Sequence, residues 1–420
     1  MKLSFKYVVP RKARREKAII EDLMWHTTKV YNTLLYEIKE KQEVVNYRGS
    51  INVQSSKIYK RYRQENWHSE YLHSHSLQQV IINVLTNMKS YTRLKEEYEK
   101  GNEEIKGKPR VPRFKGDKSQ EVVITKCGIR VVGKVIKLSI SKKMQEKHKV
   151  KSLNFLIPRK LKKLICFESI KMIKIQKSNN EIVLNIIYEK EAKTDVVGNN
   201  IMAIDIGLNN IVACSNKDNN NSMVISGRSL KSKNIYYNEK ISYLQQISTK
   251  MNKGKYKVTK QIKQLYKKRN NYMYTYIHKV SREVIEYAKA NKCGTIVIGD
   301  IKDIKQKMKW NKTFVQVPVQ SILQKIEYKA KLENIDVKLI KENYTSGVSA
   351  LDKEEVTKEN YNKKRRICRG LFVTNTGKKI NADINGSLNI LSKYIKENSP
   401  NQEIAMDNGR EQRPIKKRVA

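Results

Sequence analysis

Hydrophobic residues in the first 190 positions are spaced as in a helical segment followed by a series of strands. Residues 1–9 alternate enough to form a strand. Apolar side chains then recur at helical spacing from Lys17 to Glu40 and from Leu77 to Met88. Short apolar runs with turn residues between them fill positions 120–190, a pattern typical of a small β-barrel or β-sandwich. We therefore expect a β-rich first half with inserted helices.

The second half, beyond a polar stretch from Lys193 to Asn200, alternates between strands and helices. The pattern first predicts three strands and a long helical region over 235–290. A strand, a helix, a strand and a last helix follow, at 294–301, 313–334, 335–346 and 381–396. This order of elements is typical of the ribonuclease-H-like fold, a mixed α/β architecture.

Positive charge changes the functional picture. The chain has 87 Lys and Arg against 41 Asp and Glu, a formal net charge of +46. So many positive charges repel one another in the compact state unless a polyanion neutralises them. A basic protein gains affinity for nucleic acid because each phosphate that it neutralises releases counterions. A basic run from Lys253 to Arg269 and the loop at 107–116 are candidate phosphate-facing segments. Charge alone does not separate a nucleic-acid binder from an enzyme.

Composition excludes several other classes of protein. A hydrophobic content of 39% argues against a disordered chain. No apolar run approaches the roughly 18 residues of a membrane span, and the basic N-terminus lacks the apolar core of a signal peptide, so we expect a cytoplasmic protein. The five cysteines are scattered and form no CxxC pair, which argues against a disulfide framework and a four-cysteine zinc site.

Two acidic residues occupy informative positions. Asp205 ends the first strand of the α/β half, and Asp383 opens its last helix. In a ribonuclease-H-like fold the first strand is central and the last helix packs beside it. Carboxylates in these two places can share a pair of magnesium ions about 4 Å apart. Taken singly, each residue is also typical of a turn or a helix N-terminus, and it is their occurrence in one fold that favours a metal site.

The IDIG turn around Asp205 also opens actin-like ATPases and sugar kinases. Those proteins need a second DxG hairpin and a glycine-rich adenosine site, and the sequence contains neither feature. We therefore set this class aside.

Several linked motifs together resemble the TnpB family. These are transposon-encoded OrfB accessory proteins, RNA-guided DNA endonucleases with a RuvC domain that are related to compact type V CRISPR effectors. The resemblance covers nearly the whole chain in order. Its segments are YLHSHSLQQVIINVLTNMKSY at 71–91, KPRVPRFK at 108–115, AIDIGLNN at 203–210, TIVIGDI at 295–301, ENYTS at 342–346 and NADINGSLNI at 381–390.

The resemblance implies a multi-domain α/β protein in which a RuvC domain follows a β-barrel-like wedge domain with an inserted helical recognition domain. The implied boundaries are 1–9 and 105–195 for the wedge domain, 10–104 for the recognition domain, 196–395 for the RuvC domain and 396–420 for a flexible tail. A degenerate finger is expected near 344–380 within the RuvC domain.

The middle acid of the family's site departs from the usual pattern, because Gly299 stands where a Glu is expected. Asp300 is adjacent, but a one-residue offset in a strand points its side chain to the opposite face. Glu342 ends the following strand, and neighbouring strands lie about 4.8 Å apart. Resemblance to TnpB-like proteins with a rearranged site favours Asp205, Glu342 and Asp383 as catalytic and metal-binding residues. A set with Asp300 remains the alternative.

Zinc is a second departure from the family. Many members carry two CxxC pairs between the second and third acidic motifs, whereas residues 344–380 contain only Cys368. Four soft ligands cannot be assembled there, so we expect no structural zinc.

The resemblance also implies the partners and the activity. The partners are a guide RNA encoded near the transposon end and double-stranded target DNA, which two Mg²⁺ ions help to cleave beside a short flanking motif. A nuclease-inactive, guide-directed repressor remains open because of Gly299, and so does an RNA-binding protein with a vestigial nuclease fold. Two basic clusters are the expected nucleic-acid contacts: Lys108, Arg110, Arg113 and Lys115, and Lys363, Lys364, Arg365, Arg366 and Arg369.

Overall fold

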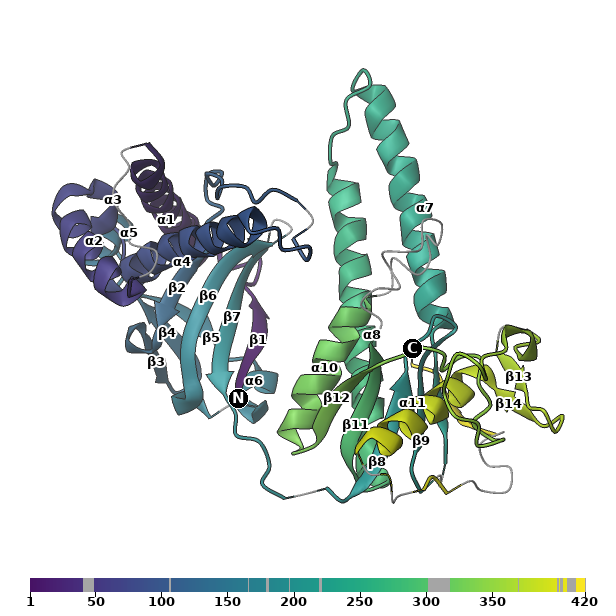
Figure 1. The fold of residues 1–420 in the computed structure, drawn as a ribbon. Helices are drawn as coiled ribbons and strands as arrows, with labels where there is room; N and C mark the ends of the chain where they lie inside the picture. Colours follow the sequence, from purple (N-terminus) through teal and green to yellow (C-terminus); the bar gives the residue numbers. More distant parts are fainter. Residues whose placement is uncertain are drawn as a thin grey trace. The chain divides into compact units, whose positions relative to one another are not determined.

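The structure is a computed structural model with two compact units, Met1–Lys190 and Glu191–Ala420, each described here by itself (Figure 1). It describes residues 1–40, 49–105, 107–164, 166–178, 181–195, 197–218, 221–300, 318–368, 370–398, 400, 403–405 and 413–419.

The first unit contains two antiparallel sheets. The four-stranded sheet has the order β1-β7-β6-β2, with bounds Lys2–Val8, Glu181–Glu189, Ile170–Ser178 and Val122–Thr125. The three-stranded sheet has the order β3-β4-β5, with bounds Ile129–Val132, Val135–Ser139 and Ser152–Leu156. Within the described part of the chain, the edge strands β1 and β2 do not pair with each other, so of the expected barrel or sandwich no closed barrel is found. A barrel needs its edges hydrogen-bonded, and apolar alternation alone does not specify that pairing.

Four helices of the first unit pack beside these sheets. They are α1 (Arg14–Glu40), α2 (Ile51–Glu65), α3 (Trp67–Glu70) and α4 (Ser74–Glu99). The helices predicted over 17–40 and 77–88 are confirmed, and both are longer than predicted. Two short helices, α5 (Lys142–His148) and α6 (Arg159–Leu164), join strands. Helices and sheets share one hydrophobic core, because the buried faces of α1 and α4 contribute to the same cluster as the strands.

The second unit is built on a six-stranded sheet of order β12-β11-β8-β9-β10-β15. Strands β8, β9 and β10 form an antiparallel meander, whereas β11 and β12 run parallel to β8. The parallel strands therefore end at the same edge of the sheet. The bounds are β8 Asn200–Asp205, β9 Asn210–Asn216, β10 Met223–Ser226, β11 Cys293–Asp300, β12 Asp336–Lys341 and β15 Ile415–Lys417.

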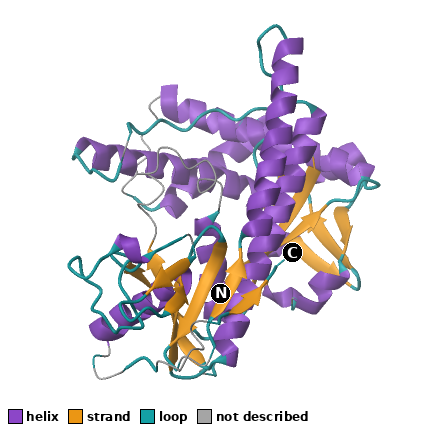
Figure 2. Cartoon of the chain, turned by 90° about the vertical axis from the view of Figure 1, so that its right-hand side faces the viewer, coloured by secondary structure: helices purple, strands orange, loops and turns teal. Residues whose placement is uncertain are grey.

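Helices cover both faces of this sheet (Figures 1 and 2). Met202 and Ile204 of β8 face the core formed with α8 (Lys260–Ala290) and α10 (Val319–Leu332). Ala203, the residue between them, faces α11 (Ala382–Asn398) together with Val297 of β11. The predicted order of strands and helices in this half is thus the observed one.

A long helical hairpin extends from the sheet of the second unit (Figure 1). It consists of α7 (Arg228–Met251) and the first part of α8, which lie side by side. The helical region predicted over 235–290 is interrupted around Lys253 and Gly254, which both have positive φ and so form the turn at the tip. We call residues 228–282 the helical arm.

The end of the chain differs from the prediction. Ile415–Lys417, within the expected flexible tail, form β15 and pair in parallel with β10, and Val419 is buried in the core beside α8. The tail prediction is therefore wrong at these residues. Two apolar side chains among charged ones are too short a pattern to predict a strand that depends on an open sheet edge.

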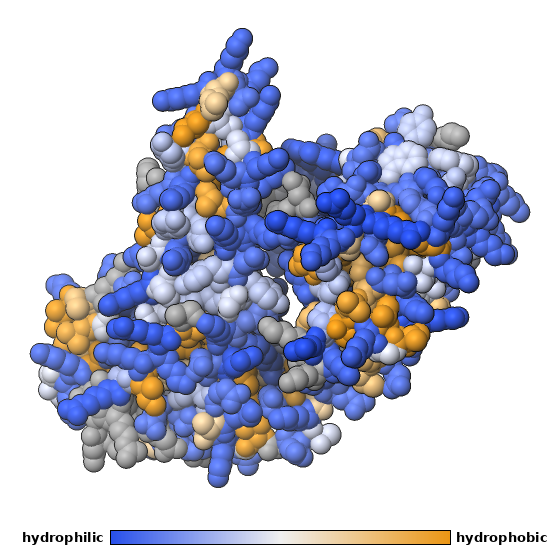
Figure 3. All heavy atoms as spheres, turned by 180° about the vertical axis from the view of Figure 1, so that it is seen from behind, coloured by the Kyte–Doolittle hydropathy of each residue, from blue (hydrophilic) through white to orange (hydrophobic). Residues whose placement is uncertain are grey.

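The helices are also informative about membranes. Among the described residues, no helix is long and apolar enough to cross a bilayer. Figure 3 shows hydrophilic residues over most of one face, with apolar residues in separate patches.

Candidate active site

Asp205 and Gly299 lie side by side where two parallel strands end. Ile204 of β8 pairs with Ile298 of β11, so the next residue of each strand, Asp205 and Gly299, follows at the same level. Side chains alternate along a strand, and Ala203 and Val297, two residues earlier, face α11. The Asp205 carboxylate therefore points toward the side of the sheet on which α11 packs.

Glu342 reaches this place from the neighbouring strand. Gly299 pairs with Ile340 of β12, and Glu342 lies two residues beyond Ile340, on the same face. Its side chain lies directly over Gly299, because a Cβ atom added at position 299 would collide with the Cγ, Cδ and Oε1 atoms of Glu342. The Glu342 side chain thus occupies the space that a side chain at position 299 would fill.

Asp383 approaches from the first turn of α11. Its Oδ2 accepts a hydrogen bond from Asn210 Nδ2 at 2.8 Å, and its Oδ1 lies 3.3 Å from Arg366 Nη2. One turn further along α11, Gly386 faces the strand end, since a Cβ added there would lie 2.6 Å from Asp205 Oδ2. A glycine at this point lets the helix come close to the Asp205 carboxylate.

Asp205 and Glu342 are partly buried, and each lies near other carboxylates. Burial raises the pKa of Asp205 well above its usual range, and the neighbouring carboxylates of Glu342 and Asp383 raise it further. Burial, followed by the charge of Asp300, raises the pKa of Glu342 to about 7. Glu342 Oε1 is buried without a hydrogen-bond partner among the described residues. Mutually repelling carboxylates with an unsatisfied oxygen are typical of sites that bind a cation.

Asp300 occupies a different position from the other acids. It follows Gly299 by one residue, so it shares the strand face of Ile298, which belongs to the core with α8 and α10. Its charge still reaches Glu342, as the raised pKa of Glu342 indicates. Asp205, Glu342 and Asp383 are gathered on the α11 side, with Asp300 at the edge of the group.

The donor set fits a hard divalent cation, although the side chains do not yet surround one. Three carboxylates supply the oxygen ligands that Mg²⁺ prefers. Within the described ranges, no three His, Cys, Asp or Glu side chains lie as close as ligands of one metal ion. Asp383 is instead paired with Arg366 and Asn210. Metal binding would require the carboxylates to close in and Arg366 to release Asp383.

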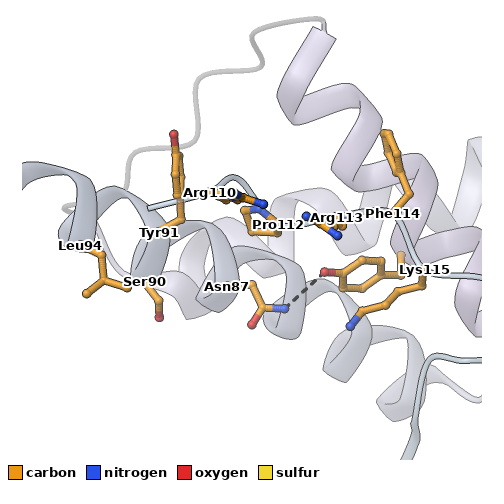
Figure 4. A pocket seen from close by; sticks show the side chains of 10 residues that line it. Asn87, Ser90, Tyr91, Leu94, Arg110, Pro112, Arg113, Phe114 and Lys115 are labelled. Carbon is orange, nitrogen blue, oxygen red and sulfur yellow. Dashed lines mark hydrogen bonds between the residues drawn. The ribbon is translucent and has the colours of Figure 1, made fainter. Parts of the chain in front are cut away.

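The first basic cluster lines a cavity in the first unit (Figure 4). Arg110, Arg113 and Lys115 lie in its wall, and Lys108 is exposed nearby in the sequence. The same cavity includes Tyr31 of α1 and Asn87 of α4. The three cations are thus brought together with aromatic and amide groups, a combination that their positions in the sequence do not predict.

The second basic cluster is divided in its contacts. Lys363 and Lys364 are exposed. Arg365 donates to Glu354 Oε2 at 2.6 Å, and Arg366 donates to Asp383 Oδ1 at 3.3 Å, so both guanidinium groups have a carboxylate partner. Arg369 lies outside the described residues.

Three residues of the site were missed from the sequence: Asn210, Arg366 as a partner of Asp383, and Gly386. Asn210 lies in the IDIGLNN turn and Gly386 in NADINGSLN, so both stood in motifs that attracted attention for their acids. Their roles depend on the approach of α11 to β8, which sequence spacing does not describe.

Comparison with known proteins finds two matching family models. Residues 185–305 match a family model described as a probable transposase, OrfB_IS605, and residues 320–390 match one described as Cas12f1-like, TNB domain. The resemblance to the TnpB family, and to compact Cas12f effectors, is thereby confirmed.

The particular relatives are distant. TnpB-like protein ORF457 of Acidianus two-tailed virus is 24% identical over 203 residues, which is 47% of this chain and 42% of that protein. The match thus spans less than half of that relative. A chain from the Cas12f1–sgRNA–target DNA complex has a TM-score of 0.62 and 19% identity, covering 91% of this chain and 83% of that one. This likeness establishes a shared mixed α/β fold.

Proposed function

We propose that the chain is an RNA-guided, magnesium-dependent endonuclease that cleaves double-stranded DNA next to a short flanking motif. The observation that carries the proposal is the Glu342 side chain lying over Gly299, beside the buried Asp205 carboxylate. The strand order β10-β9-β8-β11-β12 is that of a ribonuclease-H-like sheet, which supports assigning the second unit to a RuvC domain. We assign the first unit to the wedge and recognition domains.

Asp205, Glu342 and Asp383 are the residues that would hold two Mg²⁺ ions. Bound Mg²⁺ supplies a water of lowered pKa for attack and stabilises charge on the leaving oxygen. The protein's own contribution is to hold the ligands in place. Asn210 orients Asp383 through Oδ2, and Gly386 keeps α11 close to Asp205. The positive charge of Arg366 partly neutralises the acids in the free protein. It opposes the rise in the pKa of Asp205 that burial and the neighbouring carboxylates cause.

The proposed partners are a guide RNA, encoded near a transposon end, and target DNA, met in the cytoplasm. The solved structure with the same fold is a complex with a guide RNA and target DNA, and one matching family model is a probable transposase. The charge distribution agrees, because Glu239 is the only acid in the helical arm, which is otherwise rich in Lys and Arg. A basic arm of this length suits the backbone of a heteroduplex, whose sequence is specified by base pairing.

The deciding experiment is cleavage of a plasmid library, with randomised sequence beside the target, by the purified ribonucleoprotein. Wild type is expected to cleave the plasmid. Asp205→Ala and Glu342→Ala are each expected to lower the cleavage rate at least a hundredfold, which is an increase on the order of 2.7 kcal/mol in activation free energy. Asp300→Ala, one residue from Gly299 on the other strand face, is the matched control and is expected to keep most activity.

Two outcomes would contradict the proposal. Full cleavage by Glu342→Ala together with a dead Asp300→Ala would move the middle acid to Asp300. Guided binding of the target without any cleavage by wild type would instead identify a nuclease-inactive, guide-directed binding protein.

A further inference from the structure

The cavity of the first unit is an open hollow lined by basic, aromatic and amide side chains (Figure 4). Its volume is about 420 Å³, within the range of roughly 300–1,000 Å³ that is typical of ligand pockets. Helices α1 and α4 form two of its sides, and the loop 107–116 forms the third.

The loop is fixed to α1 before any ligand arrives. Asn32 of α1 donates from Nδ2 to the backbone oxygen of Lys115 at 2.9 Å and accepts from the backbone nitrogen of Lys115 at 2.8 Å. Pro109 and Pro112 restrict the backbone ahead of this clamp. Little conformational entropy therefore remains to be lost when the loop binds a ligand.

The cavity is positively charged, and its cations are available to a ligand. Arg110, Arg113 and Lys115 line it, and among the described residues none of the three forms an ion pair with a carboxylate. Two guanidinium groups and an ammonium group suit phosphate oxygens, since arginine binds phosphate through paired N–H donors. Three cations exceed the charge of one phosphodiester, so the cavity has enough positive charge for adjacent phosphates of a strand.

Aromatic and amide groups complete the wall. Tyr91 of α4 packs on the core with part of its ring and stands beside Arg110 (Figure 4). Tyr31 is almost fully buried, and its hydroxyl oxygen accepts a hydrogen bond at 3.4 Å from Nδ2 of Asn87, which is half-buried. A flat ring stacks on a nucleobase, and an amide group binds the base edge.

We propose that this cavity holds one unstacked nucleotide of a single-stranded nucleic acid. Arg110, Arg113 and Lys115 bind its flanking phosphates, Tyr91 stacks on its base, and Asn87, held by Tyr31, contacts the base edge. The proposal deepens the proposed function by naming a partner group for the first basic cluster. It needs only nucleic-acid binding, and not cleavage.

The test is site-specific photocrosslinking of the full chain. The crosslinker p-benzoylphenylalanine replaces Leu94, a partly exposed residue of the cavity wall, and the protein is irradiated with a labelled single-stranded DNA of about 16 nucleotides. The same strand with abasic sites is the ligand control. We expect the abasic strand and the Tyr91→Leu variant to reduce crosslinking about fivefold or more, and Tyr91→Phe to retain it.

Matched controls separate the cavity from general basicity. Tyr98 lies two turns beyond Tyr91 on α4 and outside the cavity, so Tyr98→Leu, and the crosslinker placed at Tyr98, are expected to show no dependence on bases. Arg113→Gln, an exposed position, is expected to weaken crosslinking of both strands. Equal yields from normal and abasic strands, or an unchanged yield in Tyr91→Leu, would overturn the proposal. Cleavage is not measured, so an inactive nuclease leaves the result intact.

Discussion

One glycine decides where the middle carboxylate of the candidate site lies. At position 299 a side chain would occupy the volume that holds Glu342, so a carboxylate at 299 and one from Glu342 compete for one place. The absence of Glu from the β11 strand end therefore does not remove an acid from the site. It changes the strand from which the acid comes.

Gly299→Ala tests this exclusion directly. The new methyl group has no room beside the Glu342 side chain, which must leave its position. We expect guided cleavage to fall at least tenfold, about 1.4 kcal/mol, while the protein stays folded by circular dichroism. The double variant Gly299→Glu with Glu342→Gly moves the carboxylate to the other strand and is expected to recover part of the activity. Unchanged cleavage by Gly299→Ala would contradict the exclusion.

Glu342 also makes the stability of the metal-free protein depend on pH. Its pKa in the folded state is raised from 4.5 to about 7, so the folded chain binds a proton that the unfolded chain releases, and stability is lost as pH rises between these values. Glu342→Gln removes this loss. In EDTA at pH 8, the free energy of unfolding of the variant should exceed that of wild type by on the order of 2–3 kcal/mol. At pH 4.5 the two proteins should be equally stable.

Urea unfolding at the two pH values measures the difference. Glu327→Gln, an exposed position on α10, controls for loss of a charge. The same stability difference for Glu342→Gln at pH 4.5 and at pH 8 would show that the carboxyl does not titrate in this range.

At this scale the sequence predicted the acids better than their surroundings. Asp205 and Asp383 lie at the ends of elements with clear periodicity, so their positions could be predicted. The contacts of Asp383 with Asn210 and Arg366 join segments far apart in the chain, and no spacing rule describes them.

Among the elements, the segment between β12 and α11, where the finger was expected, is connected by carboxylate hydrogen bonds. Glu354 accepts from Arg365 at 2.6 Å, from Asn375 Nδ2 at 2.7 Å and from the backbone of Ser349 at 3.0 Å. Asp352 accepts from the backbone of Asn375 at 2.8 Å. These bonds connect the start of the segment to the turn of the hairpin β13 (Leu371–Val373) and β14 (Lys379–Asn381). Two carboxylates thus connect this loop to the hairpin turn.

The finger gives a prediction for zinc and for stability. Glu354→Gln leaves Arg365, a largely buried guanidinium, without its charge partner, and we expect a loss of about 1–3 kcal/mol in the free energy of unfolding. The neighbouring pair Glu355–Lys396 is exposed, so Glu355→Gln is the control and should change stability by less than about 1 kcal/mol. A zinc-selective chelator, added with Mg²⁺ in excess, should leave the melting temperature of wild type unchanged. One zinc per chain by metal analysis would contradict this account.

Element prediction succeeded where amphipathic periodicity was long. The helices α1, α4 and α8 present continuous apolar faces, and their existence was predicted. Helix α2 was missed because it buries only Ser55 and Tyr62 and carries little apolar periodicity. The sheets of the first unit were predicted as strands but not as open sheets, since edge pairing is a tertiary property.

For the whole molecule, the net charge of +46 opposes compactness. Salt should therefore stabilise the free protein. Each kcal/mol of repulsion that salt screens should raise the melting temperature by about 2–4 °C. At low salt, heparin should raise the melting temperature as well, and added NaCl should remove the heparin effect. Scanning fluorimetry measures both. A melting temperature of the free protein that falls as NaCl is raised would show that attractive ion pairs outweigh the repulsion.

The pairing of β15 with β10 has a consequence for folding on the ribosome. Strands β8, β9 and β10 are synthesised long before residues 413–419, yet β10 acquires its outer neighbour only from those residues. Until they emerge, the nascent chain presents an unpaired strand edge, the kind of surface that seeds association between copies. Slow elongation through the second half would prolong this exposure.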